Sequence, residues 1–151
     1  MELMDGVKIS GWFWFQLYNS KGELKEERFV PNAMTTTGLA SVAALLVADK
    51  AFTGYDYIAY GTGVTAVASA NTALEAEVAR MGTSGTVVTT TSALDTGQLV
   101  SITTFGASFA ITEAGVFNAS SSGNLLCRQT FAAINVVSGD SLQVTYKVKA
   151  A

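Results

Sequence analysis

Alternation of apolar and polar residues dominates the chain and predicts mainly β-strands. Residues 7–30 predict a β-hairpin, because the first strand alternates and residues 19–22 supply a turn whose glycine can adopt a positive φ. The return strand, residues 23–30, carries five charged side chains, which is typical of a solvated edge strand. Further strands are predicted at residues 52–60, 86–91, 98–110, 111–118, 125–131 and 141–149, with a hairpin loop at 119–124.

Two segments show helical spacing instead. Residues 38–48 repeat apolar positions every three to four residues and follow a run of threonines that can cap a helix. Thr72 and Glu75 form a capping-box pattern in front of residues 76–80, which predicts a second, short helix. We therefore expect one domain, residues 1–151, of α+β class and mainly β: an antiparallel sandwich or barrel-like module with an N-terminal hairpin and two short helices.

The first strand of the hairpin carries large apolar side chains on both faces. Phe13 and Phe15 share one face, and Trp12 and Trp14 share the other. Such a strand is either central in a sheet or half-covered by a partner, and the pattern alone does not separate core from interface. We predict that these four residues form an interface, in which one face packs on the subunit's own sheet and the other meets a neighbouring subunit.

Composition excludes several kinds of chemistry. The chain has no His and 1 Cys, so it lacks the side chains for a zinc site, a Ser–His or Cys–His couple, or an internal disulfide. Cys127 is expected to be a packed thiol, because no base is available to activate it. Charged residues make up 14% of the chain and the net charge is −3, which gives no basic field for a phosphate backbone. We expect no enzyme activity, no metal or cofactor and no nucleic-acid partner.

The scarcity of charge leaves two interpretations open. The chain is either an ordinary Ala- and Thr-rich domain or one whose surface is covered by neighbouring subunits. No signal-peptide pattern is visible, and the apolar run at 39–48 is about half a membrane span. Synthesis in a reducing cytosol is therefore expected, with no membrane partner.

Two motifs could carry chemistry. Residues 61–66 match G-x-G-x-x-A, but no helix is predicted to open at Gly63 and the βαβ frame of a dinucleotide site is missing, so a turn is favoured. Glu113 lies among apolar neighbours in a predicted strand, where a carboxylate needs a cation. We predict a structural ion pair of Glu113 with Arg128 or Arg80, rather than a general acid that lacks a second catalytic group.

Stretches along nearly the whole chain resemble a widespread group of small virion proteins of tailed bacteriophages. Five motifs in register carry this resemblance, and the chain then closes on a strand. The stretches are residues 38–40 (GLA) after Asn32, 57–63 (YIAYGTG), 71–80 (NTALEAEVAR), 111–118 (ITEAGVFN), 128–131 (RQTF) and the closing 141–146 (SLQVTY).

The resemblance implies a non-enzymatic structural component that is made in the host cytoplasm and carried in the virion. Because heptads and fibre repeats are missing, we expect a stand-alone head decoration (cement) protein that binds copies of itself, as a trimer, and the major capsid protein. A tail, baseplate or fibre-adaptor subunit remains the alternative within this class. A host-receptor or carbohydrate-binding module is a further alternative, with these aromatic stacking residues: Trp12, Trp14, Tyr55, Tyr57 and Tyr60.

Overall fold

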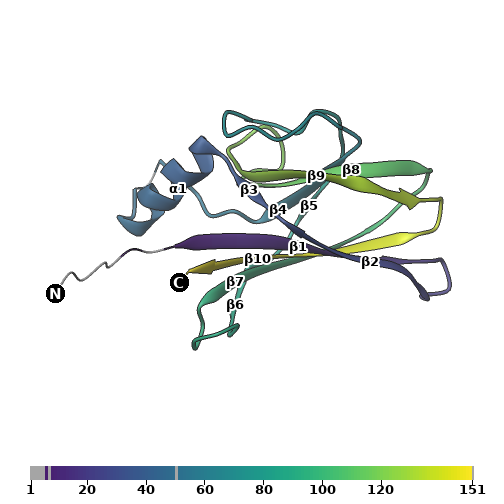
Figure 1. The fold of residues 1–151 in the computed structure, drawn as a ribbon, viewed down its shortest axis with the longest axis horizontal. Helices are drawn as coiled ribbons and strands as arrows, with labels where there is room; N and C mark the ends of the chain where they lie inside the picture. Colours follow the sequence, from purple (N-terminus) through teal and green to yellow (C-terminus); the bar gives the residue numbers. More distant parts are fainter. Residues whose placement is uncertain (1–5, 7, 50, 151) are drawn as a thin grey trace.

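Two antiparallel five-stranded sheets face each other in the computed structural model, which describes residues 6, 8–49 and 51–150 (Figure 1). Sheet A has the order β2 (Leu24–Pro31), β1 (Ile9–Tyr18), β10 (Ser141–Ala150), β7 (Thr96–Thr104) and β6 (Thr86–Val88). Sheet B has the order β3 (Ala33–Met34), β9 (Leu125–Val136), β8 (Phe109–Phe117), β4 (Tyr57–Gly61) and β5 (Glu77–Gly82). The sheets are not closed into a barrel, so the sandwich form of the expected mainly β fold is confirmed.

The predicted N-terminal hairpin is present as β1 and β2. Its turn is fixed by the Asn19 side chain, whose Oδ1 accepts hydrogen bonds from the backbone N–H groups of Lys21 and Glu23. Gly22 has φ +80°, a conformation that glycine adopts without a Cβ penalty. β2 is an edge strand as expected, while β1 is central between β2 and β10. Residue 7, at the start of the predicted hairpin, lies outside the described residues.

Helix α1 (Thr36–Leu46) confirms the prediction for residues 38–48 and lies at one end of the sandwich (Figure 1). Thr35 caps it by accepting a 2.9 Å hydrogen bond from the Gly38 N–H. Gly38 is required because a Cβ there would lie 2.1 Å from the Leu126 carbonyl oxygen of β9. Within the described part of the chain, no helix is long and apolar enough to span a membrane.

The second predicted helix is wrong. Residues 72–76 are irregular and the following residues form β5, which pairs with β4. The backbone N–H groups of Glu75 and Ala76 donate to the distant Glu113 carboxylate instead of taking part in a helical first turn. A long-range acceptor therefore overrides the local capping-box pattern.

Several strand boundaries also differ from the predictions. β7 ends at Thr104 and β8 begins at Phe109, so the break between these strands is at residues 105–108 rather than between residues 110 and 111. β4 begins at Tyr57 rather than at residue 52, and β6 ends at Val88 rather than at residue 91. β9 continues to Val136, where its final residues pair with the start of β8.

The hydrophobic core fills the space between the two sheets. Sheet A contributes inward-facing side chains from β1, β7 and β10, and sheet B contributes them from β4, β8 and β9. Tyr60 crosses this core and shares hydrogen bonds through its hydroxyl with Ser101 Oγ at 2.9 Å and Thr103 Oγ1 at 2.7 Å. The two sheets are thereby joined by polar contacts as well as by apolar burial.

Candidate functional site

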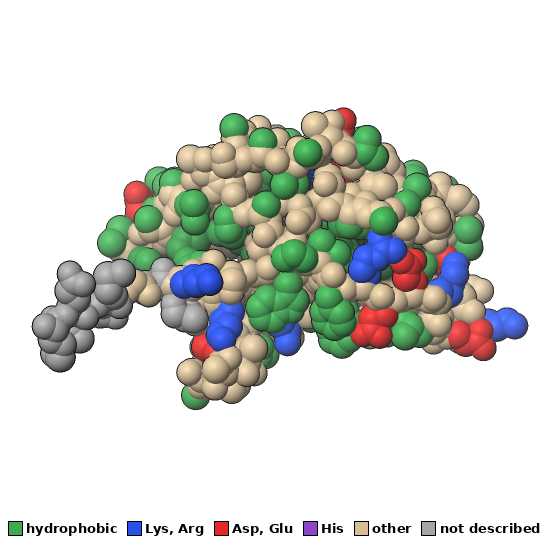
Figure 2. Space-filling model, viewed as in Figure 1, with side chains coloured by type: hydrophobic (Ala, Val, Ile, Leu, Met, Phe, Trp, Pro, Cys, Tyr) green, Lys and Arg blue, Asp and Glu red, His purple; other side chains and the backbone are tan. Residues whose placement is uncertain are grey.

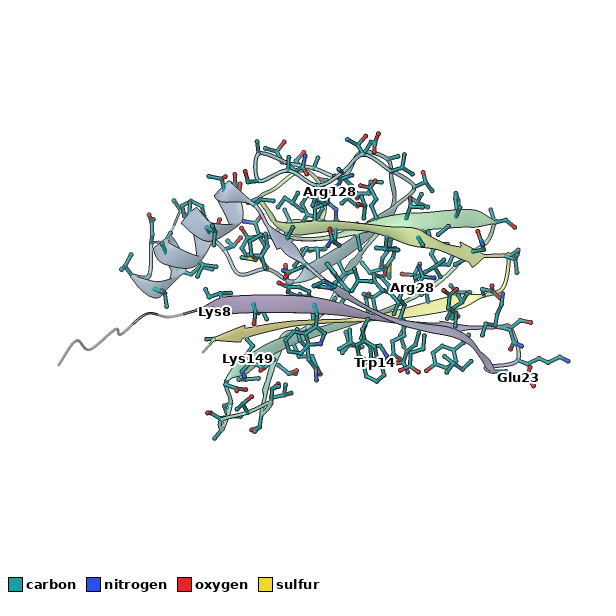
Figure 3. The ribbon with its side chains drawn as sticks, in the orientation of Figure 1. Lys8, Trp14, Glu23, Arg28, Arg128 and Lys149 are labelled. Atoms are coloured by element: carbon teal, nitrogen blue, oxygen red, sulfur yellow. The ribbon has the colours of Figure 1, made fainter. Side chains whose placement is uncertain are left out.

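The face of sheet A that points away from sheet B carries the molecule's candidate interface. Strand pairing places Trp14 between Phe29 of β2 and Thr145 of β10, and places Val100 of β7 beside Thr145. Figure 3 shows Trp14 on the side of sheet A away from the core. We call this surface the outer face; it comprises Trp12, Trp14, Gln16, Glu27, Phe29, Pro31, Gln98, Val100, Ile102, Gln143, Thr145 and Lys147.

The outer face combines exposed apolar side chains with a rigid aromatic pair. Phe29 is 63% exposed, and Val100 and Ile102 are 40% and 59% exposed. The rings of Trp14 and Phe29 stack with centroids 5.4 Å apart and planes 9° apart. Trp14 Nε1 donates a 2.7 Å hydrogen bond to Glu27 Oε1, which fixes the indole further. Along the lower edge of the view in Figure 2, large hydrophobic side chains lie beside acidic and basic ones.

The structure divides the predicted interface residues between surface and core. Trp12 and Trp14 lie on the outer face and are partly exposed. Phe13 and Phe15 are 0% and 1% exposed and pack in the core, so theirs is the face that lies on the subunit's own sheet and only the tryptophan face is open to a neighbouring subunit. Strand alternation explains the split, because neighbouring residues of one strand point to opposite sides of the sheet. The exposed outer face includes residues of four different strands, which the pattern of one strand could not reveal.

The predicted ion pair forms between Glu113 of β8 and Arg128 of β9. Both side chains are buried, and Arg128 Nε donates a 2.9 Å hydrogen bond to Glu113 Oε2. The Glu113 carboxylate also accepts bonds from three backbone N–H groups, those of Gly63 at 3.1 Å, Glu75 at 3.0 Å and Ala76 at 2.7 Å. One carboxylate therefore anchors the connection between β4 and β5 onto sheet B.

The two glycines of the G-x-G motif lie directly against the Glu113 carboxylate. A Cβ on Gly61 would lie 2.5 Å from Glu113 Oε1, and a Cβ on Gly63 would lie 2.5 Å from the same oxygen. Both glycines therefore let the backbone approach the carboxylate closely. The sequence indicated a turn at this motif but not its partner, because Glu113 lies about fifty residues further along the chain.

Arg80, the other predicted partner of Glu113, lies elsewhere. It donates to Glu77 through Nε at 2.9 Å and Nη2 at 2.6 Å, and to the carbonyls of Ala119 and Ser122. Its guanidinium also lies 3.6 Å from the centre of the Phe117 ring. Arg80 thus fixes the β8–β9 loop rather than the buried carboxylate, because strand β5 directs it to that end of sheet B.

Two pockets lie outside the Trp14–Phe29 surface. A polar one of about 200 Å³ adjoins Arg128, whose Nη2 has no hydrogen-bond partner among the described residues and lies 3.8 Å from Glu75 Oε2. An apolar one of about 430 Å³ lies beside α1, between Leu45 and Val148 among others.

Cys127 is fully buried, and burial raises the pKa of its thiol to about 11. No cluster of three or more His, Cys, Asp or Glu side chains suited to a metal ion occurs in residues 6, 8–49 and 51–150. Comparison with known proteins found no matching family model, no similar curated protein and no similar solved structure. The physical character of the outer face is therefore the main guide to function.

Proposed function

We propose that this chain is a non-enzymatic structural subunit of a tailed-bacteriophage particle and that it decorates the outside of the head. The outer face of sheet A attaches it to a neighbouring protein subunit of the particle. The motif resemblance supplies the class of protein. The observation that carries the attachment site is the exposed aromatic pair Trp14–Phe29, fixed by a ring stack and by the Glu27 hydrogen bond.

A fixed aromatic surface suits binding to another protein. Tryptophan is enriched among residues that dominate interface energies, and a side chain already ordered loses less conformational freedom on binding. Exposed aliphatic side chains on β7, Val100 and Ile102, extend the apolar surface across the sheet. A patch of this kind is typical of a surface that a neighbouring subunit covers.

The carbohydrate-binding alternative receives less support. Its five proposed stacking residues do not share one face, because Trp12 and Trp14 lie on sheet A whereas Tyr60 is buried in the core. Tyr57 belongs to β4 in sheet B. A sugar could therefore not stack on all five rings at one site.

The test is particle incorporation of a Trp12→Ala, Trp14→Ala double variant, supplied from a plasmid to phage that lack the wild-type chain. We expect a folded protein, since neither indole is in the core, but at least a tenfold loss of incorporation. Val64→Ala is the control, because it also truncates an exposed hydrophobic side chain, 74% exposed, but one that lies away from the outer face. Normal incorporation of the double variant would refute the attachment site, and unfolding would show that the tryptophans are core residues.

A further inference from the structure

Two opposite charges lie symmetrically about Trp14 on the outer face. Lys147 of β10 is paired with Trp12, one outward-facing position before Trp14, and Glu27 of β2 is paired with Gln16, one outward-facing position after it. The lysine is therefore one strand to one side of Trp14, and the glutamate is one strand to the other. Trp14 is the midpoint of the diagonal that joins the two charges.

The Lys147 ammonium and the Glu27 carboxylate can each form a further polar contact. Within the described part of the chain, the Lys147 ammonium forms no ion pair or hydrogen bond, whereas Lys149 on the same strand binds Thr91 Oγ1 at 2.5 Å and lies 3.9 Å from Asp95. Glu27 uses Oε1 for the Trp14 indole, so Oε2 is left to accept from another donor. The Lys147 ammonium and the Glu27 carboxylate on the outer face thus have no counter-ion among the described residues of their own subunit.

A two-fold rotation exchanges these two positions. Two copies can stack outer face to outer face about a two-fold axis that lies between them. If this axis runs over Trp14 and is perpendicular to the Lys147–Glu27 diagonal, it brings each lysine over the other copy's glutamate. We propose that a second copy of this chain covers the outer face in this way. Trp14 and Phe29 then pack at the centre of the interface, and two identical ion pairs flank them. This inference rests on the proposed function only in using the same attachment surface.

Other simple two-fold arrangements do not match the charges. An axis parallel to the strands would place Lys147 over Pro31 of the second copy, and an axis directly across the strands would place it over Gln143. Either arrangement covers an ammonium group without supplying an anion, which is unfavourable. The diagonal axis is therefore the one of these three that satisfies both charges.

The outline of sheet A is compatible with the diagonal arrangement. The β6–β7 hairpin projects from sheet A away from sheet B in Figure 1, at the Lys149 end of the sheet. β6 and β2 are the two edge strands. The rotation carries the β6–β7 end past the β2 edge of the second copy, beside its β1–β2 turn, rather than onto its aromatic centre. The result is a dimer rather than the trimer expected from the sequence.

Reversal of the two charges provides the test, read by sedimentation equilibrium of the purified protein. We expect a wild-type dimer, at least tenfold weaker dimerisation for Lys147→Glu and for Glu27→Lys, and recovery in the Lys147→Glu, Glu27→Lys double variant. Asp56→Lys is the control, since it makes the same charge change as Glu27→Lys at an exposed position directly before β4 of sheet B, away from the outer face. Circular dichroism establishes that each variant is folded.

Each outcome separates this inference from the proposed function. A wild-type monomer or trimer, unaffected single variants, or a double variant that fails to recover would overturn the two-fold pairing. If the protein is a monomer yet Trp12→Ala, Trp14→Ala still abolishes incorporation, the pairing is wrong while the attachment surface stands. If the charge-reversal series behaves as expected but the protein is missing from particles, the pairing stands and the virion function is wrong.

Discussion

Replacing Glu113 by alanine tests whether the buried carboxylate holds sheet B together. Glu113→Ala leaves the Arg128 guanidinium, 2% exposed, without its buried counter-ion and leaves three backbone N–H groups without their acceptor. Removing one partner of a buried ion pair costs about 3–5 kcal/mol, and each buried N–H left unsatisfied costs about 1–3 kcal/mol.

The expected loss of folding free energy equals the ion-pair penalty alone rather than the sum of the ion-pair and N–H penalties. Glu75 Oε2 already lies 3.8 Å from Arg128 Nη2, and the partly exposed Glu75 side chain can move closer to the guanidinium. Water can reach the exposed segment that contains the Glu75 and Ala76 N–H groups. We therefore expect about 3–5 kcal/mol, a large share of the roughly 5–15 kcal/mol that stabilises a typical domain.

Urea unfolding at neutral pH measures this loss. With an m value of about 2 kcal/mol/M, a loss of 4 kcal/mol lowers the midpoint by about 2 M. Glu77→Ala is the matched control, because Glu77 is an exposed carboxylate paired with Arg80, and we expect a loss below about 1 kcal/mol. Glu113→Gln combined with Arg128→Met should destabilise less than the sum of the two single changes. An unfolding midpoint unchanged by Glu113→Ala would refute the structural role and reopen a functional one.

Two further predictions concern titratable groups. Backbone N–H bonds from Ser92, Thr90 and Thr91 hold the pKa of the Asp95 carboxyl well below its usual value. The Asp95 carboxylate therefore stabilises the fold fully above the unfolded-state pKa, and this stabilisation is lost as pH falls through the folded-state pKa. Thermal melts should show falling stability below about pH 4, with a smaller fall for Asp95→Asn. Cys127, with its pKa raised to about 11 by burial, should resist a disulfide reagent at pH 8 until urea unfolds the chain, whereas rapid labelling of the folded protein would contradict its burial.

Local patterns were sufficient to predict the elements whose contacts are local. The hairpin follows from two β-like segments joined by a turn that Asn19 and Gly22 stabilise within five residues. Helix α1 follows from apolar spacing and the Thr35 cap. The separation of Phe13 and Trp14 onto opposite faces follows from the alternation of a single strand.

Long-range contacts explain what the sequence could not predict. The capping-box pattern at Thr72 and Glu75 indicated a helix, but the N–H groups there bind Glu113, 37 to 38 residues away. The outer face likewise depends on which strands are neighbours, and β1 pairs with β10 across almost the full length of the chain. Neither partner can be identified from spacing within one segment.

The most direct test of the proposed function is a cryo-electron microscopy map of phage particles whose genome encodes this chain. The account predicts that the sandwich lies on the outer surface of the head, with Trp12 and Trp14 buried against a neighbouring subunit. Density for the chain on the tail alone, or on the head with both tryptophans facing solvent, would contradict the account, as would its complete absence from the particle.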